Sequence, residues 1–178
     1  MGELLMNYKE EIIKAMSLLA KDDRVLFLGQ TVGYSGSAIF DTLKQIPAEK
    51  RIELPIMEDA QLGMCIGLSL EGYIPVSVYP RFDFLLLACN QLVNHLDKYE
   101  EMSNGQFKPK VIIRTMVGNK KPLDPGIQHC QDYSSAFHCL LKNVQVQQLY
   151  HSESIVPAFM QALADDQSHL FIEYAKLY

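Results

Sequence analysis

The sequence of 178 residues has no long hydrophobic run and no concentration of charge of one sign. No stretch approaches the roughly 20 apolar residues that cross a bilayer, and the N-terminus lacks a basic segment followed by an apolar one, so we expect a cytoplasmic protein. The 16 Lys and Arg and 21 Asp and Glu residues are interspersed. This distribution argues against a nucleic-acid or membrane partner and favours a small-molecule substrate or another protein.

Cysteine is scarce, and the familiar cysteine patterns are missing. The four cysteines are far apart, with no C-x-x-C pair, which argues against a disulfide framework. The dipeptides His129-Cys130 and His138-Cys139 match no common zinc-ligand spacing. We therefore expect no metal ligands in this chain.

Nucleotide-binding and serine-hydrolase motifs are missing as well. Neither G-x-G-x-x-G nor G-x-x-x-x-G-K-[ST] occurs, which removes most of the support for dinucleotide or nucleoside-triphosphate binding. The segment "GYSG" at residues 33–36 is one residue short of the nucleophile motif G-x-S-x-G, so Ser35 is not predicted to be a nucleophile.

What the sequence does contain is a regular alternation of strand and helix patterns. Short apolar runs typical of buried strands are separated by segments with apolar residues at helical spacing. Asn7, followed by Glu10, is the expected N-cap of the first helix. We expect strands at about 24–29, 51–56, 73–80, 108–117, 144–150 and 169–178, and the main helices at about 7–20, 58–71, 82–102, 133–141 and 154–166.

This alternation predicts the fold class. Strands that are apolar throughout and separated by helices are typical of a parallel sheet covered on both faces. Residues 1–178 are therefore predicted to form a single three-layer α/β domain with a mostly parallel sheet. No repeat or linker interrupts the pattern.

Three segments carry a resemblance to a known family. In chain order they are "PIMEDAQLGMCIGLSLEGYIPV", "RFDFLLLACNQLVNHLDKYEEMSNGQFKPKVIIR" and "GIQHCQ". Together they resemble the pyrimidine-binding domain of the thiamine-diphosphate enzymes of the transketolase superfamily. The resemblance is strongest to the N-terminal half of the beta subunit in the first component of 2-oxoacid dehydrogenase complexes. It extends over nearly the whole chain and implies the same parallel α/β fold.

The resemblance assigns a catalytic role to Glu58. It matches the family's glutamate in the pattern P-I-x-E, which hydrogen-bonds the pyrimidine ring of the cofactor and activates it. A carboxyl group in a semi-apolar pocket can share a proton near neutral pH. The alternative is a carboxylate that only stabilises the helix start, which is the role we expect for Asp59.

Three further residues are predicted site residues by the same resemblance. Phe82 or Phe84 would stack on the pyrimidine, Phe82 matching the family position slightly better, with simple core filling as the alternative for each. His129 would lie near the substrate, where an imidazole can relay a proton or orient a carboxylate, and a solvent-exposed histidine is the alternative. Two features depart from the family: Cys130 replaces a serine, and Gln30 stands where beta subunits carry an acidic residue.

The resemblance also implies a split enzyme, because the family's G-D-G motif for magnesium and diphosphate is missing from this chain. Thiamine diphosphate would be shared with an alpha-like, diphosphate-binding subunit that carries the magnesium. The polar residues Gln91, Asn94 and His95 lie opposite the apolar stripe of the helix predicted at 82–102 and suggest an interface. We expect a homodimer alone, inactive by itself, and a heterotetramer with the partner.

The chain also ends where beta subunits continue into a C-terminal transketolase domain. The predicted reaction cleaves or joins a carbon–carbon bond next to a carbonyl, in a 2-oxo acid or a ketose. One alternative is a non-catalytic partner or regulatory domain that keeps the fold and binds a protein. Another is a flavodoxin-like binding domain.

Overall fold

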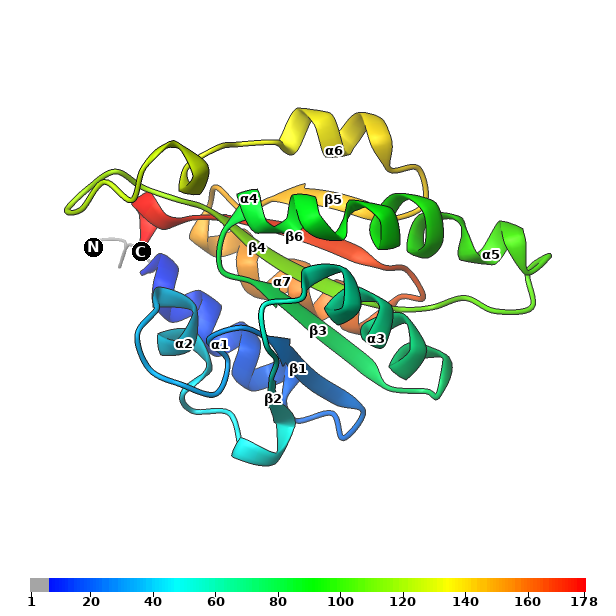
Figure 1. The fold of residues 1–178 in the computed structure, drawn as a ribbon. Helices are drawn as coiled ribbons and strands as arrows, with labels where there is room; N and C mark the ends of the chain where they lie inside the picture. Colours follow the sequence, from blue (N-terminus) through cyan, green and yellow to red (C-terminus); the bar gives the residue numbers. More distant parts are fainter. Residues whose placement is uncertain (1–6) are drawn as a thin grey trace.

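The computed structural model describes residues 7–178; residues 1–6, on which part of the N-terminal sequence reading rests, lie outside the described range. Six strands form one sheet in the order β2-β1-β3-β4-β6-β5, and every pairing is parallel (Figure 1). The predicted α/β class and parallel sheet are confirmed. The strands are β1 Val25–Gly29, β2 Arg51–Glu53, β3 Ile74–Tyr79, β4 Ile112–Val117, β5 Gln145–Gln148 and β6 His169–Tyr174.

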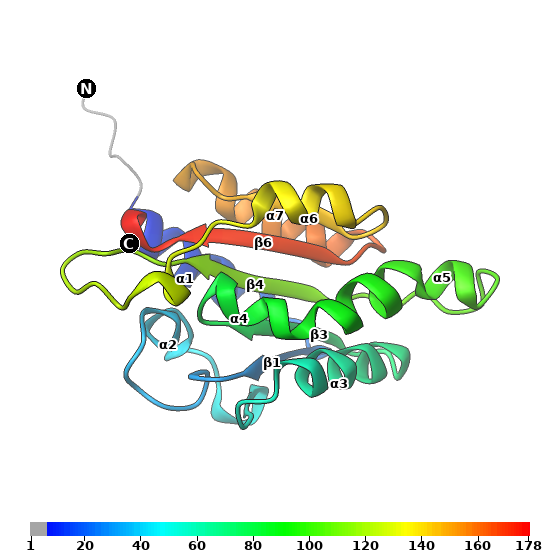
Figure 2. The same cartoon turned by 45° about the horizontal axis from the view of Figure 1, so that its top comes forward.

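Helices cover both faces of the sheet, as Figures 1 and 2 show. On one face lie α1 (Tyr8–Leu19), α2 (Ala38–Leu43) and α7 (Ser152–Ala164), whose apolar side chains form one core cluster with the strands. On the other face, α3 (Glu58–Leu70), α6 (Ser134–Leu140) and the segment from Phe82 to Met102 form a second cluster. The two clusters make this a three-layer domain.

The elements agree with the sequence patterns except near some ends. Asn7 caps α1, and its side-chain oxygen accepts a hydrogen bond from the Glu10 N–H at 3.3 Å. The strand predicted from residue 108 begins only at Ile112, because Pro109 has no N–H and the Lys110 N–H donates to the Ser69 hydroxyl. The last predicted strand ends at Tyr174, where a 3₁₀ turn (η6, Ala175–Leu177) begins.

The long helix predicted at 82–102 is present but irregular. It begins as α4 (Phe82–Leu85) and ends as α5 (Tyr99–Met102), with 3₁₀ turns η2 (Leu86–Ala88) and η4 (Leu96–Lys98) and a π-helical turn η3 (Asn90–His95) between them. A π turn holds one extra residue and is frequent near functional sites. It changes which side chains face the neighbouring helix.

Two polar side chains of this segment, Gln91 and Asn94, form hydrogen bonds with other residues of the same chain. The Gln91 amide donates to Asp59 of α3 at 3.2 Å, and Asn94 is hydrogen-bonded to Asn90 and Lys98 along its own helix. The segment is therefore tied to α3, the helix that carries Glu58.

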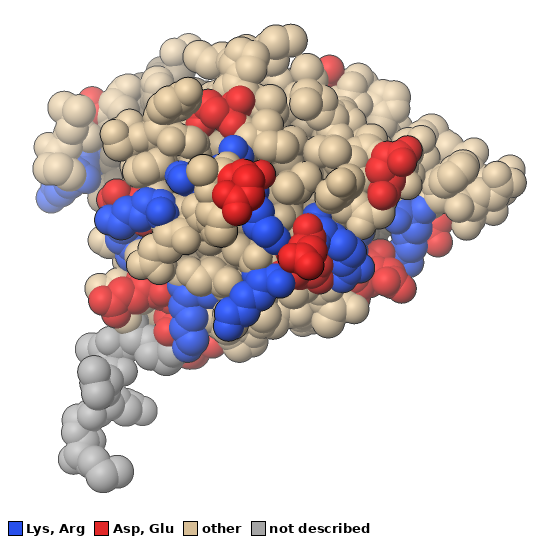
Figure 3. Space-filling view, turned by 90° about the horizontal axis from the view of Figure 1, so that it is seen from below, with Lys and Arg blue, Asp and Glu red and all other residues tan. Residues whose placement is uncertain are grey.

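Charge is mixed over the part of the surface that Figure 3 shows, where basic and acidic side chains lie beside one another. Between residues 7 and 178, no helix is both long and apolar enough to cross a membrane. In the same range, no three His, Cys, Asp or Glu side chains are grouped so as to hold a metal ion, and the four cysteines are free thiols.

Candidate active site

The predicted site residues gather at the carboxyl edge of the sheet, the edge where β6 leads to the C-terminus in Figure 1. β1 lies between β2 and β3. The chain runs from β1 to β2 on one side of it and then crosses to β3 on its other side, so the direction of the strand order reverses at β1. In parallel α/β sheets, ligands bind outside the carboxyl ends of the strands at such a switch point. Gln30 follows β1, and Glu58 begins α3 after β2.

Glu58 is buried, with 4% of its surface exposed, and lines a cavity of about 420 Å³. Asp59, the next residue, is exposed and accepts the hydrogen bond from Gln91. Both carboxylates line this cavity, but their surroundings differ: Glu58 is buried, whereas Asp59 is exposed and already paired with Gln91. The remaining lining residues are Met57, Ala60 and Leu87.

The Glu58 carboxylate has one side-chain partner among residues 7–178, the amide of Gln30, whose Nε2 lies 3.3 Å from Oε1. The loop after Gln30 is held by Glu53 at the end of β2. Its carboxylate accepts the N–H groups of Thr31, Val32 and Gly33 at 2.7, 2.8 and 2.7 Å. Successive backbone N–H groups of this kind form a nest for an anion, and here the anion belongs to the chain.

The strand ends beneath Glu58 are joined by Gln61, which the sequence analysis did not identify. Its Nε2 donates to the Ser77 hydroxyl at 3.0 Å and to the Val78 carbonyl at 3.1 Å. The Tyr79 hydroxyl donates to the Glu58 carbonyl at 3.4 Å. The available signal was spacing, because Gln61 lies three residues after Glu58 and so on the same helix face.

A second cavity, of about 510 Å³, adjoins the first, since Leu87 lines both. Phe84 and His129 meet in its wall, with ring centroids 5.5 Å apart and an edge-to-face angle of 82°. The cavity is bordered by residues of α4, η2 and the loop at 127–133: Asp83, Phe84, Leu86, Leu87, Ile127, Gln128, His129, Gln131 and Tyr133.

His129 lies on a 3₁₀ turn, η5 (Ile127–His129), that packs closely on the chain after β4. A Cβ atom on Gly118 would lie 1.9 Å from the His129 carbonyl oxygen, so only glycine fits there. The His129 Nδ1 atom is buried and has no hydrogen-bond partner within the described residues. A buried ring nitrogen without a partner is uncommon in folded proteins.

Asp83 connects α4 to the His129 loop. Its carboxylate accepts the Gln131 N–H and the Tyr133 hydroxyl, each at 3.4 Å. Burial and the Asp83 carboxylate raise the pKa of Tyr133, which stays a hydrogen-bond donor. Sequence reasoning missed Asp83, although a carboxylate within the aromatic segment "RFDF" was a signal for it.

The two candidate phenylalanines are placed differently. Phe82 is fully buried and packs on Phe137 and Tyr133, with ring centroids 5.2 and 5.6 Å away. It has no free face for a ligand in this chain and fills the core. Phe84 is half-buried and borders the cavity. Of the two rings, Phe84 is the one that a molecule in the cavity could reach, and Phe82 is not.

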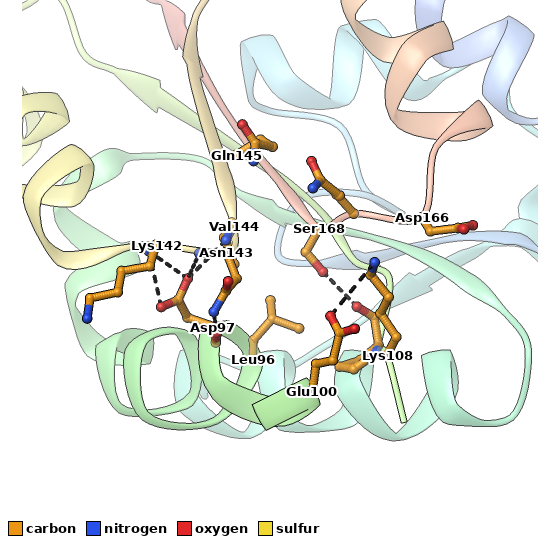
Figure 4. A pocket seen from close by; sticks show the side chains of 12 residues that line it. Leu96, Asp97, Glu100, Lys108, Lys142, Asn143, Val144, Gln145, Asp166 and Ser168 are labelled. Carbon is orange, nitrogen blue, oxygen red and sulfur yellow. Dashed lines mark hydrogen bonds and ion pairs between the residues drawn. The ribbon is translucent and has the colours of Figure 1, made fainter. Parts of the chain in front are cut away.

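A third hollow, of about 110 Å³, lies at the opposite, amino edge of the sheet and contains none of the predicted site residues (Figure 4). It is polar, and Asp97 on its wall accepts the backbone N–H groups of Lys142, Asn143 and Val144. These bonds fix the turn before β5, so we assign the hollow a structural role.

Comparison with known proteins bears on the fold and on the family that the chain resembles. No family model matches the chain. It is 28% identical over 166 residues to the pyruvate dehydrogenase E1 component subunit beta of Cyanidium caldarium, covering 90% of this chain and 49% of that protein. It is 27% identical over 180 residues to the 2-oxoisovalerate dehydrogenase subunit beta of Bacillus subtilis, covering 98% and 54%. The chain thus spans about half the length of these curated relatives.

Among solved structures, a split gene transketolase described as an inactive beta4 tetramer superposes with a TM-score of 0.72 at 18% identity, covering 94% of this chain and 51% of that one. The transketolase of Campylobacter jejuni gives 0.70 at 17%, covering 94% and 25%. These two matches support the fold. In sequence and in fold, the chain is similar to the pyrimidine-binding domain of the thiamine-diphosphate enzymes of the transketolase superfamily, as its sequence motifs predicted.

Proposed function

We propose that this chain is the pyrimidine-binding, beta-like subunit of a thiamine-diphosphate enzyme that acts on a 2-oxo acid. The observation that carries the proposal is the buried Glu58 carboxylate on a cavity that adjoins, through Leu87, a second cavity bearing Phe84 and His129. The sequence relatives favour a 2-oxo acid over a ketose, because the two named above are beta subunits of 2-oxoacid dehydrogenases.

The residues present fit the aminopyrimidine half of the cofactor. Glu58 is a carboxylate buried beside apolar side chains, where it can hold a proton and share it with a ring nitrogen. Phe84 offers an aromatic wall. His129 borders the second cavity, where an imidazole can orient a substrate carboxylate or exchange a proton. Thiamine diphosphate, when bound, supplies a carbon nucleophile and an electron sink.

The diphosphate and its magnesium are assigned to an alpha-like partner subunit. The backbone nest after β1, which would suit a phosphate oxygen, is filled by the Glu53 carboxylate. Exposed apolar side chains surround the two cavities and suit a protein partner: Ile56, Met57, Leu86, Leu87 and Ile127. On this proposal the isolated chain is inactive.

The test of this function is Glu58→Gln, compared with Asp59→Asn on the same helix turn. Glutamine keeps the size of Glu58 but cannot share a proton, so turnover by the complex with the diphosphate-binding partner should fall about 10²- to 10⁴-fold. The Asp59→Asn complex should keep parental turnover, and both variants should melt within a few degrees of the parent chain.

Hydrogen–deuterium exchange at the thiazolium carbon in the same complexes locates the effect. If exchange with Glu58→Gln stays within about threefold of the parent, Glu58 only stabilises the helix start, as in the alternative of a non-catalytic partner domain.

A further inference from the structure

The one side-chain hydrogen bond to the Glu58 carboxylate in the range 7–178 comes from Gln30, and both residues are buried, with 9% and 4% of their surfaces exposed. The Gln30 amide nitrogen faces Oε1 at 3.3 Å. The opposite amide orientation would place two oxygens against each other, so Gln30 acts as the donor.

The backbone holds Gln30 in this position. Thr31, directly after it, has a left-handed backbone with a φ of 58°, and its N–H donates to Glu53. The Thr31 hydroxyl also accepts a hydrogen bond from the Ser37 hydroxyl at 2.9 Å. The loop is thereby anchored on both sides of the nest, which limits the directions in which the Gln30 side chain can point.

We propose that Gln30 is a positioning residue for Glu58: its amide keeps Oε1 as an acceptor and leaves Oε2 as the oxygen that holds and exchanges the proton. This proposal rests on the proposed function and adds to it a residue that governs how Glu58 works. An amide can only donate to this carboxylate, whereas an acidic residue in the same place would compete with it for one proton.

Asp59 and Tyr79 are titratable groups that adjoin Glu58. Asp59 lies on its own helix and is exposed. Tyr79 lies beneath it on β3, and burial raises the pKa of Tyr79 well above its usual range. Burial also raises the pKa of the neighbouring Cys65 thiol to about 12. Neither Tyr79 nor Cys65 therefore titrates near neutral pH.

The experiment is a pH titration of the purified chain carrying ¹³C-labelled glutamate, followed by carboxyl-carbon NMR. The Glu58 signal is assigned by its loss in Glu58→Gln. In Gln30→Leu, which removes the donor, the midpoint of the Glu58 titration should rise by about one pH unit, because a hydrogen bond to the charged form has been lost. Gln91→Leu, which removes the equivalent amide from Asp59, is the matched control and should leave the Glu58 midpoint in place.

A second variant, Gln30→Glu, keeps the side chain long and polar. Two carboxyl groups in hydrogen-bond contact should titrate in two separated steps, the upper one above the parental midpoint. Thermal melting shows whether each variant folds. If Gln30→Leu does not fold, Gln30→Glu is used to test the proposal. A Glu58 midpoint within about 0.2 pH units of the parent in a folded variant overturns the proposal.

The result separates this proposal from the proposed function. A shifted midpoint together with normal turnover by Glu58→Gln would leave Gln30 as the partner of Glu58 and reject the catalytic assignment. An unchanged midpoint together with an inactive Glu58→Gln complex would keep the function and reject the role of Gln30.

Discussion

Gly118 shows how a single residue determines where His129 can lie. The missing Cβ leaves room for the His129 carbonyl, which would otherwise be 1.9 Å from that atom. We expect Gly118→Ala to push η5 away from the end of β4 and to cost about 1–3 kcal/mol of unfolding free energy. Urea unfolding measures the loss, and the NMR signals of residues 126–131 should shift.

Gly67 provides the control for this prediction. It lies inside α3, and a Cβ atom there would have no neighbour within 4 Å. Gly67→Ala should therefore stabilise the chain by about 0.5–1 kcal/mol, as alanine does in a helix interior. Equal effects of the two substitutions would show that close packing at Gly118 is unimportant.

At the residue scale, the sequence indicates which residue types can act in the site better than it predicts where their side chains point. Glu58 was identifiable because its surroundings match a long motif, and the structure places it on a cavity. The resemblance slightly favoured Phe82, whereas the structure places Phe84 on the cavity, because which of two nearby aromatic side chains points inward depends on the helix turn that begins there. Gln30 appeared only as a departure from the family, since its partner lies 28 residues away.

At the scale of elements, Asp97 joins the helical segment 82–102 to the start of β5. Its carboxylate is buried and accepts three backbone N–H groups, and its own carbonyl accepts the Asn143 side-chain amide at 2.6 Å. Asp97→Ala should cost about 2–4 kcal/mol of unfolding free energy, because buried donors lose a charged acceptor. Urea unfolding is the measurement, with no expected change in the site at the opposite edge.

The comparison for Asp97 is Glu100→Ala, in the next helical turn. Glu100 is exposed and lies 3.7 Å from Lys108, a surface pair of the kind that contributes less than about 1 kcal/mol. Losses of similar size in the two variants would contradict an anchoring role for Asp97.

Most elements could be predicted from alternation alone, because each strand is a short apolar run and each helix follows its own period. The irregular segment 82–102 could not. Its apolar stripe has ordinary helical spacing, and the π turn η3 forms where the segment packs on α3, a contact that local sequence does not encode. The early end of β6 likewise reflects the turn η6 rather than a change in composition.

At the scale of the whole molecule, the apolar residues around the site predict association. Ile56 and Ile127 are 78% and 74% exposed, and Leu87 is 63% exposed between the two cavities. Burying such side chains is favourable, so we expect a homodimer alone and a heterotetramer with the diphosphate-binding subunit. Sedimentation velocity at tens of micromolar is the measurement. A monomer both with and without a candidate partner would contradict this expectation. Leu87→Gln should weaken association, whereas Leu70→Gln, at the opposite end of α3 from Glu58, should not.

The Glu53 carboxylate occupies the backbone nest after β1, where a free anion could otherwise bind. A free backbone nest would sample whatever anions surround it, and the loop's shape would then follow the phosphate and salt content of the cell. Here the ligand of the nest is covalently part of the chain and lies 20 to 22 residues away in sequence, so its local concentration never changes. The conformation of the loop that orients Gln30 therefore does not depend on the anion concentration of the surrounding solution.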